Sequence, residues 1–103
     1  MLNEISLEVE SERTVFAAFA HRFRALRARL LVKQVTLSYY VRCTEAAISY
    51  WESGHRLPKR TTIERIMGAF GACGATQSDL DDLSRAWERA VMRRAVGSAQ
   101  QRS

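Results

Sequence analysis

The segment Gln34–Gly54, QVTLSYYVRCTEAAISYWESG, decides the fold that the rest of the chain supports. Its apolar residues are spaced as in two short helices that meet at a tight corner and bury a common side. They are Leu37, Val41, Cys43, Ile48 and Trp51. Ser38 is small enough to let the helices cross closely, Thr44 can cap the second helix, and Gly54 can end it in the left-handed conformation. Both ends of the second helix are therefore marked.

Composition indicates one all-helical domain. The 103 residues include one proline and five glycines, and a chain of this length can bury one modest core. No apolar run approaches the roughly 20 residues that cross a bilayer, and the first ten residues are acidic, unlike a signal peptide. We expect a cytoplasmic protein with no membrane contact. Cys43 and Cys73 have no CxxC spacing, so Cys43 is predicted to be a small core residue rather than a redox switch.

Charge is unevenly distributed along the chain. The side-chain charge is −4 over residues 1–12, +8 over residues 13–60 and +1 over residues 61–103, for a total of +5. The positive excess therefore coincides with the helix pair. This coincidence favours a polyanionic partner, although a solvated arginine-rich surface would give the same charges.

The residues before the helix pair predict an arm and a long helix. Residues 1–12 form an acidic arm in which Ile5, Leu7 and Val9 alternate with polar residues. This alternation suits a short strand or extended segment, either disordered or paired with a second subunit. A helix should begin near Ser11 or Thr14 and run to about Leu31. Its buried stripe is predicted to be Phe16, Phe19, Phe23, Leu26 and Leu30. Arg22, Arg24 and Arg29 lie off that stripe and should be free to face solvent or phosphate.

The residues after the helix pair predict two more helices. One should cover residues 60–70 and bury Ile63, Ile66, Met67 and Phe70. Another should begin with a capping box of Ser78 and Asp81 and run to about Val96. Its apolar stripe includes Trp87, which is either domain core or a dimer contact. Residues 98–103 are expected to form a disordered tail, so that residues 13–97 make up the domain.

The central pattern resembles the helix-turn-helix of the Cro and lambda-repressor-like (Xre) DNA-binding proteins. The resemblance covers about residues 16–72, is most specific over ISYWESGHRLP, and extends to the actinobacterial type through AWERA. The residues that carry it are Gln34, Leu37, Ser38, Val41, Cys43, Thr44, Ile48, Ser49, Glu52, Gly54 and Pro58. It implies a five-helix, all-α domain with the motif at helices 2 and 3. Arg42 departs from the glycine usual at the corner, and positive φ there would cost about 1–2 kcal/mol.

The resemblance also implies roles for individual residues. Arg27 should form a structural ion pair with Glu52, the alternative being that both are simply exposed. Base-edge contacts fall on Glu45, Ala46, Ser49 and Tyr50. For phosphate contacts the resemblance implies Gln34. Further phosphate contacts are expected from side chains beside the groove, namely Tyr40 (or Tyr39), Arg42, Thr44, Arg56, Lys59 and Arg60. Tyr40 could instead be half-buried packing.

We therefore expect a double-stranded DNA-binding transcriptional regulator, acting as a repressor and as a homodimer, with the second helix of the motif in the major groove. The alternative is a protein-binding module, or an antitoxin-like regulator with a protein partner, that reuses the scaffold. His21 and His55 have no nucleophile, carboxylate or metal-ligand partner at useful spacing. No enzyme activity, cofactor, metal or small-molecule substrate is expected.

Overall fold

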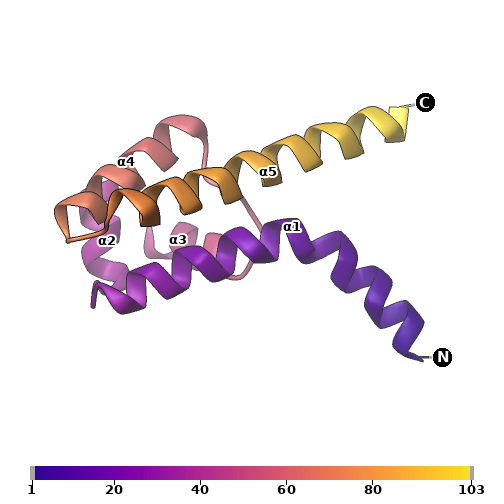
Figure 1. Cartoon of the computed structure of the whole chain (residues 1–103), viewed down its shortest axis with the longest axis horizontal. Coiled ribbons are helices and arrows are strands. Elements are labelled where there is room, and N and C mark those ends of the chain that lie inside the picture. The colour runs from indigo at the N-terminus through magenta and orange to yellow at the C-terminus, as the bar shows by residue number, and fades with distance from the viewer. Residues whose placement is uncertain (1, 103) are drawn as a thin grey trace.

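The computed structural model describes the backbone of residues 2–102 and the side chains of residues 16–96. Within residues 2–102 it contains five α-helices and no strand. They are α1 (Leu2–Arg29), α2 (Gln34–Val41), α3 (Glu45–Glu52), α4 (Arg60–Ala72) and α5 (Gln77–Arg102). The predicted all-α class and helix count are confirmed, with the short helix pair at α2 and α3 (Figure 1).

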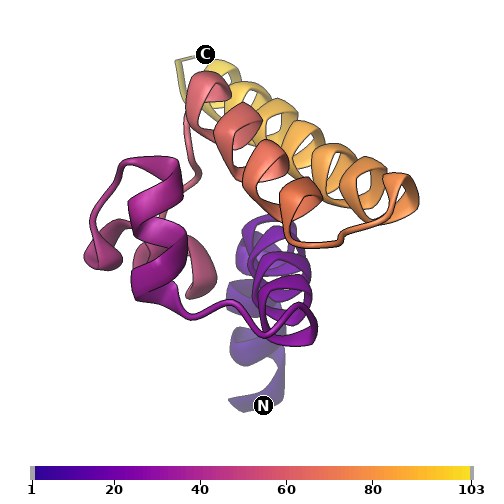
Figure 2. The ribbon, with the colours of Figure 1, turned by 90° about the vertical axis from the view of Figure 1, so that its left-hand side faces the viewer.

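The five helices pack around a single core. The long helices α1 and α5 contact each other and run in opposite directions (Figure 1), while α4 runs beside α5 (Figure 2). The pair α2 and α3 closes the other side, with α2 against α4 and α3 against α1. The longer helices α4 and α1 therefore hold the short helices α2 and α3 in place.

Aromatic rings fill the centre of the core. The Phe23 ring lies 5.9 Å from Phe19, 6.2 Å from Trp51 and 5.4 Å from Phe70, measured between ring centroids. These tilted and edge-to-face arrangements are favourable aromatic contacts. Phe19, Phe23 and Leu26 are buried, as the predicted stripe requires, and Phe16 and Leu30 at its ends are half-buried.

Trp87 belongs to the domain core. Its side chain is buried, and its indole Nε1–H donates to the Pro58 carbonyl oxygen at 2.7 Å. A buried indole N–H requires such a partner. Of the two predicted alternatives for Trp87, domain core is correct and a dimer contact is excluded by its burial within one chain.

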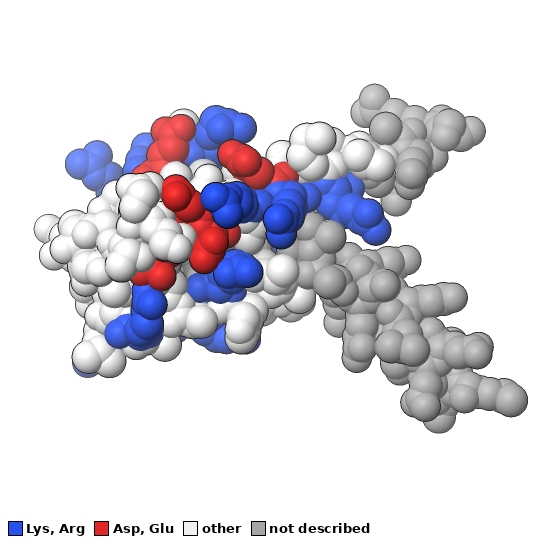
Figure 3. Space-filling model, viewed as in Figure 1, with Lys and Arg blue, Asp and Glu red and all other residues white. Residues whose placement is uncertain are grey.

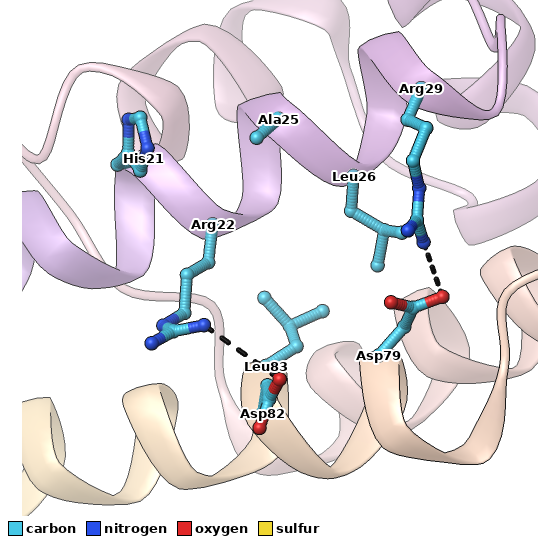
Figure 4. Close-up of a pocket in the computed structure, with 8 residues that line it drawn as sticks. All are labelled: His21, Arg22, Ala25, Leu26, Arg29, Asp79, Asp82 and Leu83. Atoms are coloured by element: carbon cyan, nitrogen blue, oxygen red, sulfur yellow. Dashed lines mark hydrogen bonds and ion pairs between the residues drawn. The ribbon is translucent and has the colours of Figure 1, made fainter.

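Ion pairs tie α1 to the start of α5. Arg29 bonds Asp79, and Arg22 Nη1 lies 3.9 Å from the Asp82 carboxylate, across a hollow of about 230 Å³ (Figure 4). Arg24 Nη1 donates to the Glu52 backbone oxygen at 2.9 Å. Arg22, Arg24 and Arg29 are all exposed, as predicted, but each also contacts an acceptor on a neighbouring helix. Helical spacing located them off the buried stripe but could not show which neighbouring helix supplied an acceptor.

Both long helices extend beyond the predicted bounds. The prediction of an extended segment around Ile5–Val9 and of a helix start near Ser11 or Thr14 was wrong, because α1 already begins at Leu2. Residues 2–12 contain no glycine or proline, and their leucines and glutamates favour helix. Likewise α5 continues through Gly97 to Arg102, since one helical glycine costs only about 1 kcal/mol. The side chains of these end segments lie outside the described residues.

The capping box of α5 is formed by Thr76 and Asp79. The Asp79 N–H donates to Thr76 Oγ1 at 3.1 Å, and the Thr76 N–H donates to Asp79 Oδ2 at 2.9 Å. The backbone N–H of Thr76 and, less strongly, Arg29 lower the pKa of Asp79. The prediction of Ser78 and Asp81 was wrong by two residues. The sequence offers the same Ser/Thr-x-x-Asp spacing twice, and α5 begins at Gln77, directly after the earlier copy's Thr76.

Replacing Thr76 by alanine should lower the free energy of unfolding by about 1 kcal/mol, because the cap of α5 is lost. Ser78→Ala, the matched control, should leave the free energy of unfolding within about 0.5 kcal/mol of wild type. Urea denaturation monitored by circular dichroism measures both values. Equal losses in the two variants would contradict the observed cap.

Candidate nucleic-acid interface

The corner between α2 and α3 is made by Arg42 in the left-handed conformation, with φ 63° and ψ 53°. The Cys43 N–H then donates to the Ser38 carbonyl oxygen at 3.1 Å. At the start of α3, Thr44 Oγ1 accepts from the Ala47 N–H at 3.0 Å. The predicted positive φ at Arg42 and the predicted Thr44 cap are both confirmed.

The end of α3 is a Schellman motif around Gly54. The Gly54 N–H donates to the Trp51 oxygen at 3.3 Å, and the His55 N–H donates to the Tyr50 oxygen at 3.0 Å. Gly54 has φ +80°, the conformation that glycine adopts without steric cost. The predicted left-handed end is confirmed, and the chain turns sharply away from α3.

The two sides of α3 differ completely in exposure. Ile48, Trp51 and Glu52 are buried against the domain. The opposite side is exposed, and it contains the four predicted base-contact residues Glu45, Ala46, Ser49 and Tyr50. The N-terminal edge of α3 thus faces outward in the described part of the chain.

A buried carboxylate fixes the orientation of α3. Only 6% of the surface of Glu52 is exposed. Arg27 binds it through both Nε and Nη2, the latter 2.9 Å from Oε1. This hydrogen bond raises the pKa of Arg27 further above its ordinary value, so the guanidinium stays charged. Arg27 Nη1 also donates to the Val32 oxygen at 2.9 Å, which connects the turn before α2 to the same ion pair.

Gln34 connects α2 to α3 through both ends of its amide. Its Nε2 donates to Glu52 Oε1 at 3.1 Å, and its Oε1 accepts from Ser49 Oγ at 3.4 Å. One carboxylate therefore accepts from α1 and from α2. Because a bidentate guanidinium and an amide have directional donors, this network determines the rotation of α3 about its axis.

Apart from half-buried Gln34, which bonds Glu52 and Ser49, the predicted phosphate-contact residues are all exposed. Arg42, Lys59 and Tyr40 are exposed, Tyr40 at 61%, which excludes the half-buried alternative. Two of the predicted residues also contact aromatic rings. The Arg56 guanidinium lies 4.9 Å from the centre of the Tyr50 ring, and the Arg60 guanidinium lies 5.1 Å from the centre of the Trp87 ring. Thr44, also exposed, uses its hydroxyl as the cap.

A cluster at the end of α3 was missed by the sequence reasoning. The cluster consists of Tyr50, Ser53, His55 and Arg56. The His55 ring lies 6.4 Å from the Tyr50 ring, and His55 Nδ1 is 2.6 Å from Ser53 Oγ. Arg56 and Tyr50 are six residues apart and meet only because the chain reverses at Gly54. Helical periodicity cannot indicate a contact that crosses a helix end.

The described residues show no feature of a metal or disulfide site. No group of three His, Cys, Asp or Glu side chains that could hold a metal lies within residues 16–96. Cys43 packs half-buried against the core, and this burial raises the pKa of its thiol. Cys73 is exposed.

No helix in the described part of the chain combines the length and apolar character of a membrane span.

Replacing Glu52 by alanine should lower the free energy of unfolding by about 3 kcal/mol, because it leaves the Arg27 guanidinium without its buried partner. Glu45→Ala removes the other acid of α3, which is exposed, and should change the value by less than about 0.5 kcal/mol. Chemical denaturation of both variants makes the comparison. An unfolding free energy unaltered by Glu52→Ala would mean that the ion pair does not stabilise the fold.

Replacing Arg42 by glycine should raise the free energy of unfolding by about 1 kcal/mol, because glycine adopts φ 63° without the clash of a Cβ atom. Arg42→Ala removes the same charge but keeps the Cβ, and should give no such gain. The difference between the two variants isolates backbone strain from charge. Equal stabilities would show that the corner is unstrained.

Comparison with known protein families agrees with this geometry. A family model described as a helix-turn-helix domain matches residues 18–83, which is more than half of the chain and includes α2, α3 and α4. A search of curated proteins and a search of solved structures each found no match. The matched range contains the corner at Arg42, the cap at Thr44 and the buried Glu52. The chain belongs to the helix-turn-helix domain family.

Proposed function

We propose that this protein binds double-stranded DNA sequence-specifically and regulates transcription, with α3 in the major groove. The observation that carries the proposal is the exposed edge of α3, Glu45, Ala46, Ser49 and Tyr50, whose opposite side is locked by Glu52. A helix of this size fits the major groove, where every base pair presents a distinct pattern of donors and acceptors.

The chemistry of this edge suggests a mixed mode of readout. Glu45 can accept from a cytosine amino group, Ala46 can contact a thymine methyl group, and the Ser49 hydroxyl suits several bases. None of these makes the strong bidentate contact of an arginine or a glutamine. Sequence preference therefore depends partly on the shape and deformability of the DNA.

Most of the affinity comes from the phosphate backbone in this proposal. Arg42 is exposed at the corner before α3, Lys59 is exposed at the start of α4, and Gln34, Tyr40 and Thr44 lie on or next to the helix pair. Arg56 stacks on Tyr50 and so joins a phosphate contact to a base contact. Arg60 lies over Trp87, so its contribution is the smallest of the set. Such contacts position the protein on the duplex without reading sequence.

The regulator is proposed to be of the Cro and lambda-repressor-like (Xre) type. Support comes from the family match together with the Arg27, Glu52 and Gln34 network, which is where the resemblance places it. A homodimer with half-sites about one helical turn apart follows from this type. Occlusion of a promoter is the simplest mechanism for a domain of this size, so the protein would act as a repressor.

A protein-binding module or antitoxin-like regulator is the second candidate. It is favoured by apolar side chains on the outer side of the motif. Leu31, Val35 and Tyr39 are exposed by 89%, 54% and 82%, and Leu31 has φ 59°. Val35 and Tyr39 lie one turn apart on α2. A partner protein could bind there while α3 remained free for DNA.

Binding to random-sequence duplex should weaken with salt, with a slope of log affinity against log salt concentration of roughly −4 to −5 per monomer. Arg42→Ala and Arg56→Ala should each reduce the magnitude of this slope by about 1, because each removes one phosphate contact. Arg65→Ala, on the exposed side of α4, is the charge-matched control and should leave the slope unchanged. Fluorescence anisotropy of a labelled duplex measures all four proteins.

Selection of bound sequences from a random pool should then give a site whose preference changes in Ser49→Ala or Tyr50→Ala. Absence of duplex binding at low salt would exclude the DNA-binding function and favour the protein-partner candidate.

A further inference from the structure

The outer face of α5 is basic with an apolar centre. An open hollow of about 570 Å³ lies along Arg85, Glu88, Arg89, Met92, Arg93 and Val96. Met92 is 65% exposed and Val96, one turn later, is 46% exposed. Positively charged side chains, all of them arginines, gather along this part of α5, whereas acidic side chains gather nearer its start (Figure 3). Residues 85–102 have a side-chain charge of +4.

The first stretch of α1 has the complementary composition. Residues 2–12 have a side-chain charge of −4, from Glu4, Glu8, Glu10 and Glu12. Their backbone is helical, and Leu2, Ile5 and Val9 recur at intervals of three and four, the spacing of one side of a helix. At 1.5 Å per residue this stretch is about 16 Å long, close to the roughly 18 Å of Arg85–Val96 on α5.

The two segments do not cover each other within one chain. The beginning of α1 and the end of α5 project from the same end of the domain and diverge (Figure 1). The ion pairs that join these two helices use Arg22 and Arg29 on α1 and the acidic start of α5. The basic face therefore lies beyond the contact that holds α1 and α5 together.

We propose that residues 2–12 of one copy bind the outer face of α5 of a second copy, reciprocally, so that two equivalent contacts close a twofold dimer. The inference rests on the homodimer of the proposed function and names its contact surface. The glutamates meet Arg85, Arg89 and Arg93, and the apolar residues of the arm cover Met92 and Val96. Because the two copies exchange arms reciprocally about a twofold axis, the assembly closes as a dimer and does not extend into a filament.

Charge reversal tests this pairing. The arm variant has Glu4, Glu8, Glu10 and Glu12 changed to Lys, and the face variant has Arg85, Arg89 and Arg93 changed to Glu. Sedimentation equilibrium should show a wild-type dimer that weakens with added salt. Each variant alone should dimerise more than about tenfold less tightly, because like charges then face each other. Glu64→Lys on the exposed side of α4 is the control and should remain dimeric.

Mixing the two variants should restore a heterodimer, since each arm then meets a face of opposite charge. A contact between the arm and the α5 of its own chain would respond differently: only a single chain with both sets of changes would recover. A monomeric wild-type protein, full dimerisation of either variant alone, or a mixture that stays monomeric would overturn the inference. Circular dichroism verifies that each variant is folded.

The same proteins separate this inference from DNA binding. Wild-type protein that binds duplex DNA as a monomer would overturn the dimer contact and leave the proposed function intact. A dimer that follows the charge-reversal pattern but does not bind duplex DNA would support the contact and overturn the proposed function.

Discussion

The structure depends on one buried charge, the Glu52 carboxylate. A carboxylate in a protein core is stable only when its lone pairs are occupied by strong donors, and here Arg27 of α1 and Gln34 of α2 supply them. Satisfying Glu52 therefore requires three helices to take up one mutual arrangement. Apolar packing alone would allow α3 to rotate or slide, whereas directional hydrogen bonds do not. The outward presentation of the opposite side of α3 follows from this constraint.

The resemblance located the motif and its internal contacts well, because these depend on local geometry. Helix ends determine the conformations and roles of Thr44, Gly54 and the left-handed Arg42. The pairing of Arg27 with Glu52 was expected from the family resemblance. The periodicity of Phe19, Phe23 and Leu26 identified the buried side of α1 because only one side of that helix can reach the core.

Features that depend on alternatives of similar energy could not be predicted. The Ser/Thr-x-x-Asp spacing occurs twice at the start of α5, and the spacing alone does not distinguish Thr76 from Ser78 as the cap. The extent of α1 was misjudged because alternation at Ile5, Leu7 and Val9 is compatible with a strand, while helix propensity favours the observed state. Arg22 and Arg29 were placed off the core correctly, but their partners are about fifty to sixty residues away in sequence. The stacking of Arg56 on Tyr50 likewise required the path of the chain after Gly54.

The hydrogen bond from Trp87 to Pro58 links α5 to the loop that follows α3. Pro58 lies in the loop that leaves α3, and Trp87 lies on α5 two residues from Arg85 and Arg89. The indole therefore anchors that loop to α5, the helix that carries the basic outer face. A tilt of α5 would therefore move this loop and, with it, the C-terminal end of α3. In the proposed dimer, the angle between the two α5 helices would then influence the separation of the two α3 helices.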